Sequence, residues 1–184
     1  MMNRASGETI DRGAIAGKAM KAGVVDECEV RGAAGLTLVF GAVGFAYAYF
    51  ANQYMPIKLV ASLFFVEFFI RVTVGLKYSP VGQLAKLLTW GQPPIWVSVK
   101  PKRFAWSLGL VMSLAMVVIA NANVRGALPL TICVICMTLM WLEAVLGLCL
   151  GCEIYRVMVL RGWIARDDAF EVCSNGACAT EDQR

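Results

Sequence analysis

ALPLTICVICMTLMWLEAVLGLCLGCEIYRVMVL, from Ala127 to Leu160, is the stretch of sequence that decides the fold. Its 34 residues include only three charged side chains, Glu143, Glu153 and Arg156. As one helix it would be about 51 Å long at 1.5 Å per residue, whereas a bilayer core is about 30 Å thick. We therefore expect a transmembrane helix that either projects beyond the lipid or breaks near Gly147 to Gly151.

Three further apolar segments precede this helix. The chain of 184 residues is 59% hydrophobic and 16% charged, whereas soluble domains carry about 25% charged residues. The sequence therefore predicts an all-α membrane protein, a four-transmembrane-helix bundle. The predicted spans are about 32–50, 57–76, 104–122 and 127–150, with the last helix extending to about 160.

The spans form one membrane domain, residues 32–160, between two polar ends. Residues 1–31 are predicted to be a cytoplasmic N-terminal arm, and residues 161–184 a cytoplasmic tail that contains cysteines. The arm has no apolar core of the kind found in signal peptides, so we expect no cleavable signal. Prolines and glycines prevent a long helix in the loop at 77–103, but a short amphipathic helix around 81–90 is compatible with the sequence.

The distribution of Lys and Arg predicts the orientation. The arm and the middle loop have five each and the segment from Cys152 has four, whereas the short turns offer only Lys58 and Arg125. Basic residues collect on the cytoplasmic side of membranes. With four spans, the three basic segments fall on one side, so both termini are predicted to be cytoplasmic. We expect a multi-pass protein of the cell inner membrane, surrounded by the lipid bilayer.

The lack of histidine and of a long basic run excludes several classes of function. The chain contains no histidine, which excludes His-based acid–base catalysis, bis-His haem ligation and zinc sites that need His. It has no long basic run with interleaved aromatic residues, so we expect no nucleic-acid partner.

Four cysteines toward the C-terminus carry the most specific chemical signal. Cys149 and Cys152 form a C-x-x-C pair, and Cys173 and Cys178 follow in the tail. Residues three apart share a helix face, so the first pair presents two thiols together. We interpret Cys149 and Cys152 as catalytic candidates for redox or sulfur-carrying chemistry, with Cys173 and Cys178 as an accessory pair.

The same four cysteines allow a metal site as an alternative. The spacing C-x2-C-x20-C-x4-C resembles spacings that hold zinc or an iron–sulfur cluster. Cys149, Cys152, Cys173 and Cys178 would then be the metal ligands. The leading interpretation needs no cofactor. A permanent structural disulfide is the least favoured state, because the cytosol is reducing.

One consideration opposes a thioredoxin-like role for Cys149 and Cys152. In that motif the reactive cysteine lies at a helix N-terminus, where the helix dipole lowers its pKa. Here the pair is expected deep in a helix or near its end, where the dipole gives no such help. Arg156 is a cation that would compensate in part. The other C-x-x-C pair, Cys133 and Cys136, is interpreted as small apolar packing residues.

Three ionisable residues lie within the predicted spans. Glu67 and Arg71 are four residues apart in the second span, and Glu143 lies in the fourth. Charged groups inside a bilayer usually face the bundle interior and pair. We interpret these three as an internal salt bridge that fixes the second helix against the fourth, with a proton or substrate path as the alternative. Gly147-x-x-x-Gly151 predicts a close approach by another helix or subunit.

Several motifs resemble a known family. They are VDECEVR at 25–31, the segment from Glu67 to Arg71, YSP at 78–80, KPKRFA at 100–105 and GLCLGCEIY at 147–155. Over roughly Val25 to Trp163 the chain resembles a bacterial family of membrane proteins, the domain-of-unknown-function family 4395. The resemblance implies a small multi-span protein with no established reaction. It also implies a link to thioredoxin-like and sulfurtransferase proteins, which points toward thiol or sulfur handling.

Three functional hypotheses follow. The first is thiol–disulfide or sulfur handling at the cytoplasmic face, with a thioredoxin-like or rhodanese-like protein as partner. The second is a non-catalytic subunit or scaffold of a larger membrane complex, and the third is the four-cysteine metal site. Whether the protein is an enzyme, its substrate and its oligomeric state do not follow from the sequence.

Overall fold

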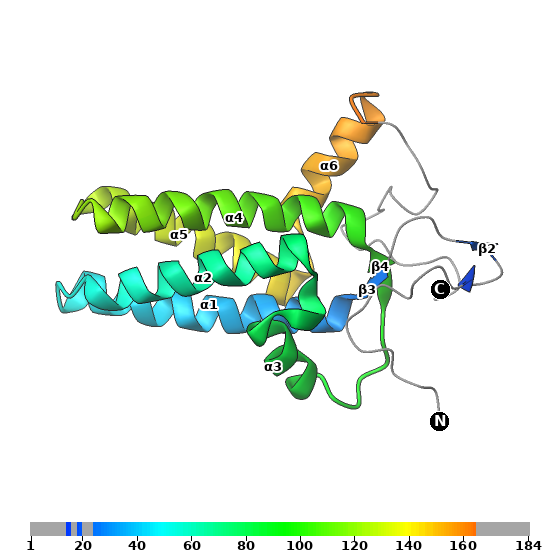
Figure 1. Ribbon diagram of the computed structural model, residues 1–184, viewed down its shortest axis with the longest axis horizontal. Helices are drawn as coiled ribbons and strands as arrows, with labels where there is room; N and C mark the ends of the chain where they lie inside the picture. The colour runs from blue at the N-terminus through cyan, green and yellow to red at the C-terminus, as the bar shows by residue number, and fades with distance from the viewer. Residues whose placement is uncertain (1–13, 16–17, 20–23, 165–184) are drawn as a thin grey trace.

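The four longest helices of this computed structural model lie side by side (Figure 1). The structure describes residues 14–15, 18–19 and 24–164, and within these ranges the chain is mainly helical. The long helices are α1 (Glu27–Phe50), α2 (Met55–Thr73), α4 (Val99–Asn121) and α5 (Ala127–Trp141).

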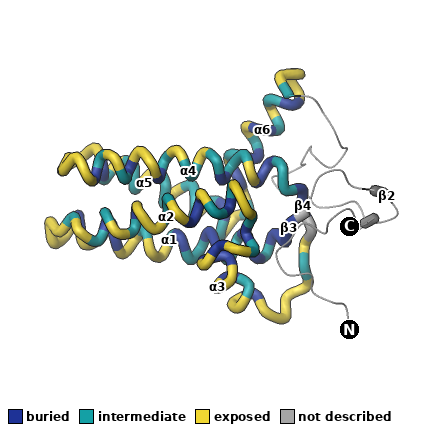
Figure 2. Tube along the Cα trace, in the orientation of Figure 1, coloured by how far each residue is buried: buried dark blue, intermediate teal, exposed yellow. Residues whose placement is uncertain are grey.

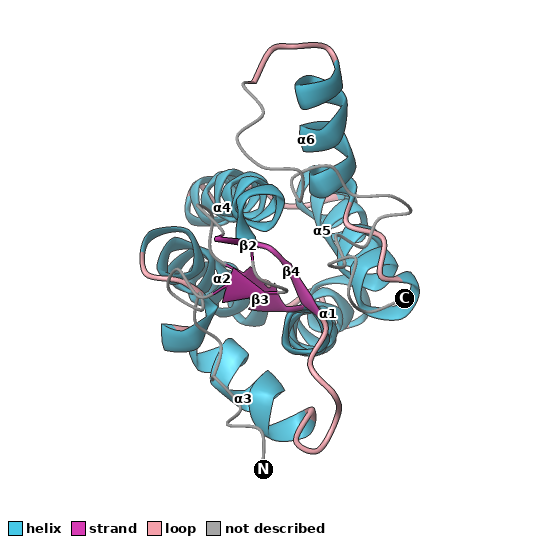
Figure 3. Ribbon diagram, turned by 90° about the vertical axis from the view of Figure 1, so that its right-hand side faces the viewer, coloured by secondary structure: helices cyan, strands magenta, loops and turns pink. Residues whose placement is uncertain are grey.

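The shorter elements gather mainly at one end of the bundle (Figure 1), and the view along the bundle shows α3 and α6 on opposite sides of the long helices (Figure 3). We call this the strand end, after the antiparallel strands β3 and β4, and the opposite end the turn end. At the turn end, residues 51–54 join α1 to α2 and residues 122–126 join α4 to α5. The shorter elements are β1 (Ala14–Ile15), β2 (Lys18–Ala19), β3 (Val24–Asp26), η1 (Leu76–Tyr78), α3 (Pro80–Leu88), β4 (Trp96–Ser98), the π-helical turn η2 (Leu142–Leu146) and α6 (Leu150–Leu160).

The first long helix begins earlier than its hydropathy indicates. It starts at Glu27, about five residues before the predicted start of the span. The reason is a polar cap, because an Asp side chain before a helix satisfies its free N–H groups. The Asp26 carboxylate accepts from Cys28 N at 3.0 Å and from Ile95 N at 3.1 Å. The same carboxylate thus ties α1 to the segment before β4, within a stretch whose sequence predicts an arm.

The middle loop contains the predicted short helix. It is α3, from Pro80 to Leu88, and the Ser79 side chain caps it by accepting from Gly82 N at 2.9 Å. The loop is shorter than predicted, because α4 begins at Val99 rather than near 104. Lys102 is therefore a helical residue, and it is buried.

Small residues of α1 let neighbouring elements approach it closely. A Cβ atom at Gly32 would lie 3.3 Å from Thr89 Cγ2, and one at Gly44 would lie 3.3 Å from Val60 Cγ2. Burial is densest toward the strand end (Figure 2). The buried apolar residues there include Val25, Val30, Ala33, Phe68, Ala85, Val97 and Trp106.

The outside of the bundle is apolar. In the described part of the chain, three helical segments are long and apolar enough to cross a membrane, namely α1, α4 and residues 127–146 of α5 with η2. Helix α2 has 19 residues but includes three charged ones. Exposed apolar patches of this extent mark contact with a membrane or a partner. The exposed side chains include Val39, Val43, Leu59, Phe69, Val111, Val118, Val134 and Trp141.

Candidate functional site

The last apolar stretch is broken between η2 and α6. Gly147 has a φ of +68°, its N–H donates to Glu143 O at 3.1 Å, and the N–H of Leu148 donates to Leu142 O at 3.1 Å. A left-handed glycine with this bonding pattern ends a helix, because glycine has no Cβ to clash there. The predicted break near Gly147 is therefore confirmed, and α6 leaves the bundle at an angle (Figure 1).

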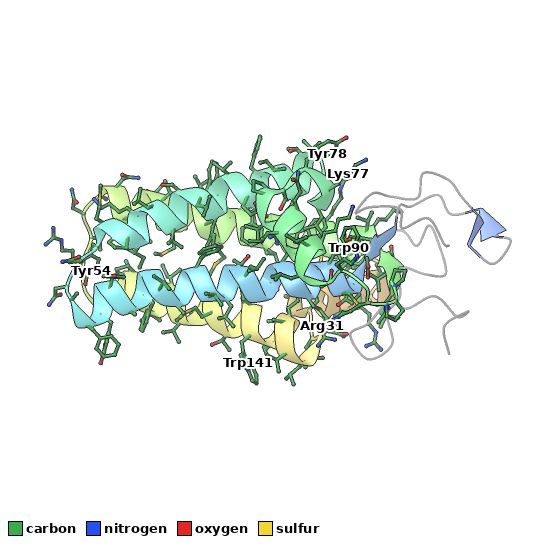
Figure 4. The ribbon with its side chains drawn as sticks, turned by 90° about the horizontal axis from the view of Figure 1, so that it is seen from below. Arg31, Tyr54, Lys77, Tyr78, Trp90 and Trp141 are labelled. Atoms are coloured by element: carbon green, nitrogen blue, oxygen red, sulfur yellow. The ribbon has the colours of Figure 1, made fainter. Side chains whose placement is uncertain are left out.

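Arg31 of α1 secures the broken end. Its Nε and Nη2 atoms each lie 3.2 Å from Ala144 O, and Nη2 lies 2.9 Å from Val145 O. Carbonyl groups at a helix C-terminus lack intrahelical donors, and a cation there is favoured by the helix dipole. Figure 4 places Arg31 at the strand end, the same end as Trp90, with Tyr54 at the turn end.

The break places Cys149 at the start of a new helix. Cys149 is the N-cap residue of α6, with an extended backbone, and its Sγ accepts a hydrogen bond from Cys152 N at 3.3 Å. Both cysteines are free thiols, and their exposed fractions are 2% for Cys149 and 1% for Cys152. The C-x-x-C pair therefore lies at a helix N-terminus.

This position corrects the expectation that the helix dipole gives the pair no help. A helix N-terminus carries partial positive charge and stabilises anions, and reactive C-x-x-C cysteines use that environment. The expectation is wrong because it places the pair deep in a helix or near its end, whereas the break at Gly147 starts a new helix at Cys149. Arg156, the expected compensating cation, instead pairs with Glu153 at 3.1 Å.

The cation beside the two sulfurs is Lys102 of α4. Its Nζ lies 2.9 Å from Glu27 Oε2 and 3.1 Å from Glu143 Oε1, and its side chain is 1% exposed. Its charge also acts on Cys149 and Cys152. Helix α1, helix α4, η2 and helix α6 thus each contribute to one buried cluster, which we call the Lys102 cluster (Glu27, Lys102, Glu143, Cys149 and Cys152).

The electrostatics of the Lys102 cluster keep Cys152 protonated. The side-chain hydrogen bond between the Cys152 and Cys149 thiols is the largest influence that raises the pKa of Cys152, and burial is the next. The charge of Lys102 lowers this pKa. Burial penalises the charged form of a thiol. The two cysteines thus occupy different positions, with Cys149 at the helix terminus and a protonated Cys152 behind it.

Glu67 and Arg71 form a separate pair. Arg71 Nε donates to Glu67 Oε1 at 2.8 Å, and both side chains are buried. The Glu67 carboxylate also accepts from Ser79 Oγ and from Val81 N, at the start of α3. The ion pairs of these described residues are Arg71 with Glu67 and Glu143 with Lys102, so the predicted direct salt bridge to the fourth span is not formed, although the charge of Glu143 acts on Arg71. Glu67 instead fixes α3 against α2.

The two glycines of the G-x-x-x-G motif have different roles. Gly147 lies outside any helix and ends η2. Gly151 lies in α6, where an added Cβ would be 2.6 Å from Ala105 Cβ. Nearby, the Phe104 and Tyr155 rings pack with centroids 5.8 Å apart. The predicted close approach therefore occurs at Gly151, against α4, but the motif does not form one continuous helical face.

A cavity of about 390 Å³ lies inside the bundle. It extends from Ile57, near the turn end, to Cys149 at the strand end, and apolar side chains form most of its wall. Arg71 and Glu143 line it near Cys149. Cys133 and Cys136 are half-buried and line it along α5. Both cysteines of the α5 pair and Cys149 of the other pair therefore border the same space.

The remaining predicted ligands cannot be placed. Cys173 and Cys178 lie outside the described residues, so the accessory pair and the four-cysteine metal site stay predictions. Within the residues that the structure describes, no group of three or more His, Cys, Asp or Glu side chains is arranged to hold a metal ion.

Sequence reasoning missed Lys102 and Glu27. Both fall in the predicted polar flanks, as part of a loop and an arm. A signal for Lys102 is present, because its spacing continues the buried face of α4 through Trp106, Gly109 and Ser113 at intervals of three or four residues. A lysine in register with a buried helix face is a candidate for an internal ion pair.

Fold and site together define a class of protein. The described part is a bundle of long apolar helices with a C-x-x-C pair at the N-terminus of a short helix. A family described as "domain of unknown function (DUF4395)" matches residues 25–159, and the chain belongs to this family. Comparisons with curated proteins and with solved structures gave no match.

Proposed function

We propose that this protein exchanges thiols and disulfides through Cys149 and Cys152, at the cytoplasmic end of a bundle that crosses the inner membrane four times. The observation that carries the proposal is the position of Cys149. It caps α6, accepts a hydrogen bond from Cys152 N and lies near the buried charge of Lys102. A helix N-terminus and a nearby cation both favour thiolate chemistry.

The two cysteines have distinct roles in the proposed reaction. The Cys149 sulfur attacks a disulfide of a partner, so that one S–S bond forms and one partner thiolate leaves. Cys152 then loses its proton and attacks Cys149, which releases the second partner thiol. In balance, two protein thiols become one disulfide and the partner disulfide becomes two thiols. A thioredoxin-like or rhodanese-like protein is the proposed partner, with Cys173 and Cys178 as an accessory pair.

Helix α2 completes the proposed four spans despite its three charged residues. Lys58 lies near the turn end, and Glu67 and Arg71 neutralise one another within the helix. An ion pair with satisfied hydrogen bonds lowers the cost of carrying charge into a bilayer. Helix α2 also packs closely on α4, since a Cβ at Gly109 would lie 2.7 Å from the Phe68 ring.

The distribution of charge supports a cytoplasmic strand end. Two basic residues, Lys58 and Arg125, lie at the turn end, whereas the strand end has several, on α1, η1, α3 and α4 and at the end of α6. The amphipathic helix α3 and the angled helix α6 lie at this end (Figure 1), and both expose apolar side chains to the lipid surface. The basic residues of the strand end include Arg31, Lys77, Lys86, Lys100, Arg103 and Arg161.

A non-catalytic membrane-complex subunit is the second candidate. One observation favours it, because Leu150, Ile154, Val157 and Leu160 form an exposed apolar row along α6. A helix of a partner protein could cover this apolar row in place of lipid. Purification in mild detergent separates the two candidates. A stoichiometric partner together with unreactive cysteines supports the subunit, and a redox-active protein purified alone supports thiol exchange.

Thiol trapping in intact cells tests the proposed exchange. Cells are quenched with acid before and after a brief disulfide stress, and free thiols are tagged with a maleimide. We expect Cys149 and Cys152 to lose and regain their thiols together. The Cys133 and Cys136 pair is the internal control, because it lies within α5 away from the helix N-terminus. If both pairs stay reduced throughout, the proposed function is wrong.

A further inference from the structure

We propose that the cavity inside the bundle binds a membrane quinone, which oxidises the Cys149–Cys152 pair. This inference rests on the function proposed above: the quinone takes the place of the partner disulfide as the oxidant of the same two thiols, and the reverse exchange with a partner dithiol reduces the pair again. The observation that carries it is the juxtaposition of a lipid-compatible cavity with Cys149.

The route to Cys149 leads through the apolar interior. The exposed fractions of Cys149 and Cys152 are only 2% and 1%, so both sulfurs lie beneath the protein surface. Cys149 nevertheless lines the cavity, together with its neighbours Leu150 and Gly151. A reactant that dissolves in the membrane can therefore approach the sulfur from inside the bundle.

The polarity of the cavity matches a quinone. The long wall is apolar, which suits an isoprenoid chain, and the volume of about 390 Å³ falls in the range of small-molecule sites. Charged groups line the strand end alone, where Arg71 and Glu143 lie with Cys149. The hydroxyls of Thr37 and Ser113 also line the wall, but each donates to a carbonyl of its own helix. A redox ring with two carbonyl oxygens would thus find its polar partners at one end.

Arg71 has a donor available for such a ring. Its Nη2 atom lies 2.8 Å from Glu67 Oε1 but makes no hydrogen bond of good geometry with any group in the described part of the chain. Arg71 Nε already donates to Glu67 Oε1. Nη2 can therefore lie close to the same oxygen without pointing an N–H at it. A buried guanidinium N–H without an acceptor favours a ligand with a carbonyl or an anionic oxygen.

The oxidation balances without a further reactant. The S–H bonds of Cys149 and Cys152 break and one S–S bond forms, which releases two electrons and two protons. The quinone takes up both electrons and both protons and becomes a hydroquinone. Glu143, which lines the cavity and is hydrogen-bonded to Lys102, is positioned to pass a proton at this end.

The test uses full-length protein in lipid nanodiscs with decylubiquinone as the probe. All cysteines other than Cys149 and Cys152 are replaced by Ser, and the reduced protein is mixed with the quinone without oxygen. We expect one quinone reduced for every two thiols lost. Ala61→Phe, which fills the cavity, should slow the reaction at least 10-fold. Ala115→Phe, on an exposed position of α4 outside the cavity, should leave the rate unchanged.

A second measurement separates the two proposals. The same samples are equilibrated with dithiothreitol, whose redox state sets that of the pair without the cavity. If dithiothreitol mixtures titrate the pair but the quinone does not oxidise it, or if both Phe variants react equally fast, the quinone inference is overturned and thiol exchange stands. If neither reagent forms the disulfide, both proposals fail. Should Ala61→Phe not insert, Gly41→Leu fills the same cavity and takes its place.

Discussion

Lys102 determines whether the buried charges at the strand end can coexist. Two carboxylates, Glu27 and Glu143, lie within 3.1 Å of its Nζ atom. A buried ion pair contributes little net stability, but removing one partner leaves the others without compensation. The cluster therefore depends on Lys102 more than on either carboxylate.

Replacing Lys102 by Met should strongly destabilise the protein. We expect the free energy of unfolding to fall by about 3–5 kcal/mol, because Glu27 and Glu143 would be left without a cation in a buried site. Thermal unfolding in detergent measures the change, with Lys86→Met as the control on a half-exposed lysine of α3. Adding Glu143→Gln should restore part of the loss. Equal stability of the two lysine variants would show that the cluster does not hold the helices together.

The raised pKa of Cys152 predicts how stability depends on pH. Folding raises the pKa of Cys152 above its value of about 8.5 in the unfolded chain. The thiol therefore contributes its full share to the free energy of unfolding below about pH 8.5, and this share falls as the pH rises further. In that range the free energy of unfolding falls by about 1.4 kcal/mol per pH unit. We expect reduced wild-type protein to lose stability between about pH 8.5 and 10.5 more steeply than Cys152→Ala does. Parallel curves would contradict this assignment.

At the scale of the element, the position of α6 is determined by two glycines. Gly147 turns the chain out of η2, and Gly151 lets α6 lie on Ala105 of α4. These two features hold Cys149 against the strand end of the cavity and bury Cys152. Any substitution that lifts α6 from α4 should therefore expose the cysteine pair.

Gly151→Ala should lift α6 away. Its Cβ would lie 2.6 Å from Ala105 Cβ and 2.7 Å from Ala105 Cα, closer than real Cβ atoms come, so the helices must separate. We expect a lower unfolding temperature and at least 5-fold faster alkylation of Cys152, which mass spectrometry can follow. Gly35→Ala is the matched control, since its Cβ would meet its nearest neighbour, Ala144 Cβ, at an ordinary 3.9 Å. Equal alkylation rates in the two variants would refute the close contact.

Hydropathy and charge predict the elements better than the site. Apolar length locates α1, α4 and α5, and the excess of length in the last stretch points to the break at Gly147. The π-helical turn that brings Glu143 to Lys102 depends on tertiary contacts, which no local pattern encodes. The sequence identifies the cysteines as the chemical residues, but it does not predict their helix-terminal position, because that position depends on the break.

At the scale of the whole molecule, the turn end and the strand end should face opposite sides of the membrane. Gln83→Cys on α3 and Val124→Cys in the α4–α5 turn report the two ends, and both positions are exposed. In a background without other cysteines, we expect a membrane-impermeant maleimide to label Val124→Cys in intact spheroplasts. Gln83→Cys should need permeabilised cells. The reverse pattern would invert the orientation, and labelling of both would refute four spans.

The central claim is that Cys149 and Cys152 are a functional redox pair at the start of α6. A redox titration of full-length protein that retains only these two cysteines tests it most directly. The protein is equilibrated with mixtures of reduced and oxidised dithiothreitol and, to reach more oxidising potentials, with mixtures of reduced and oxidised glutathione, then trapped with maleimide and weighed by mass spectrometry. We predict a single two-electron transition in which both thiols disappear together, and its loss in Cys149→Ser. Two thiols that remain free at every ratio would contradict the account.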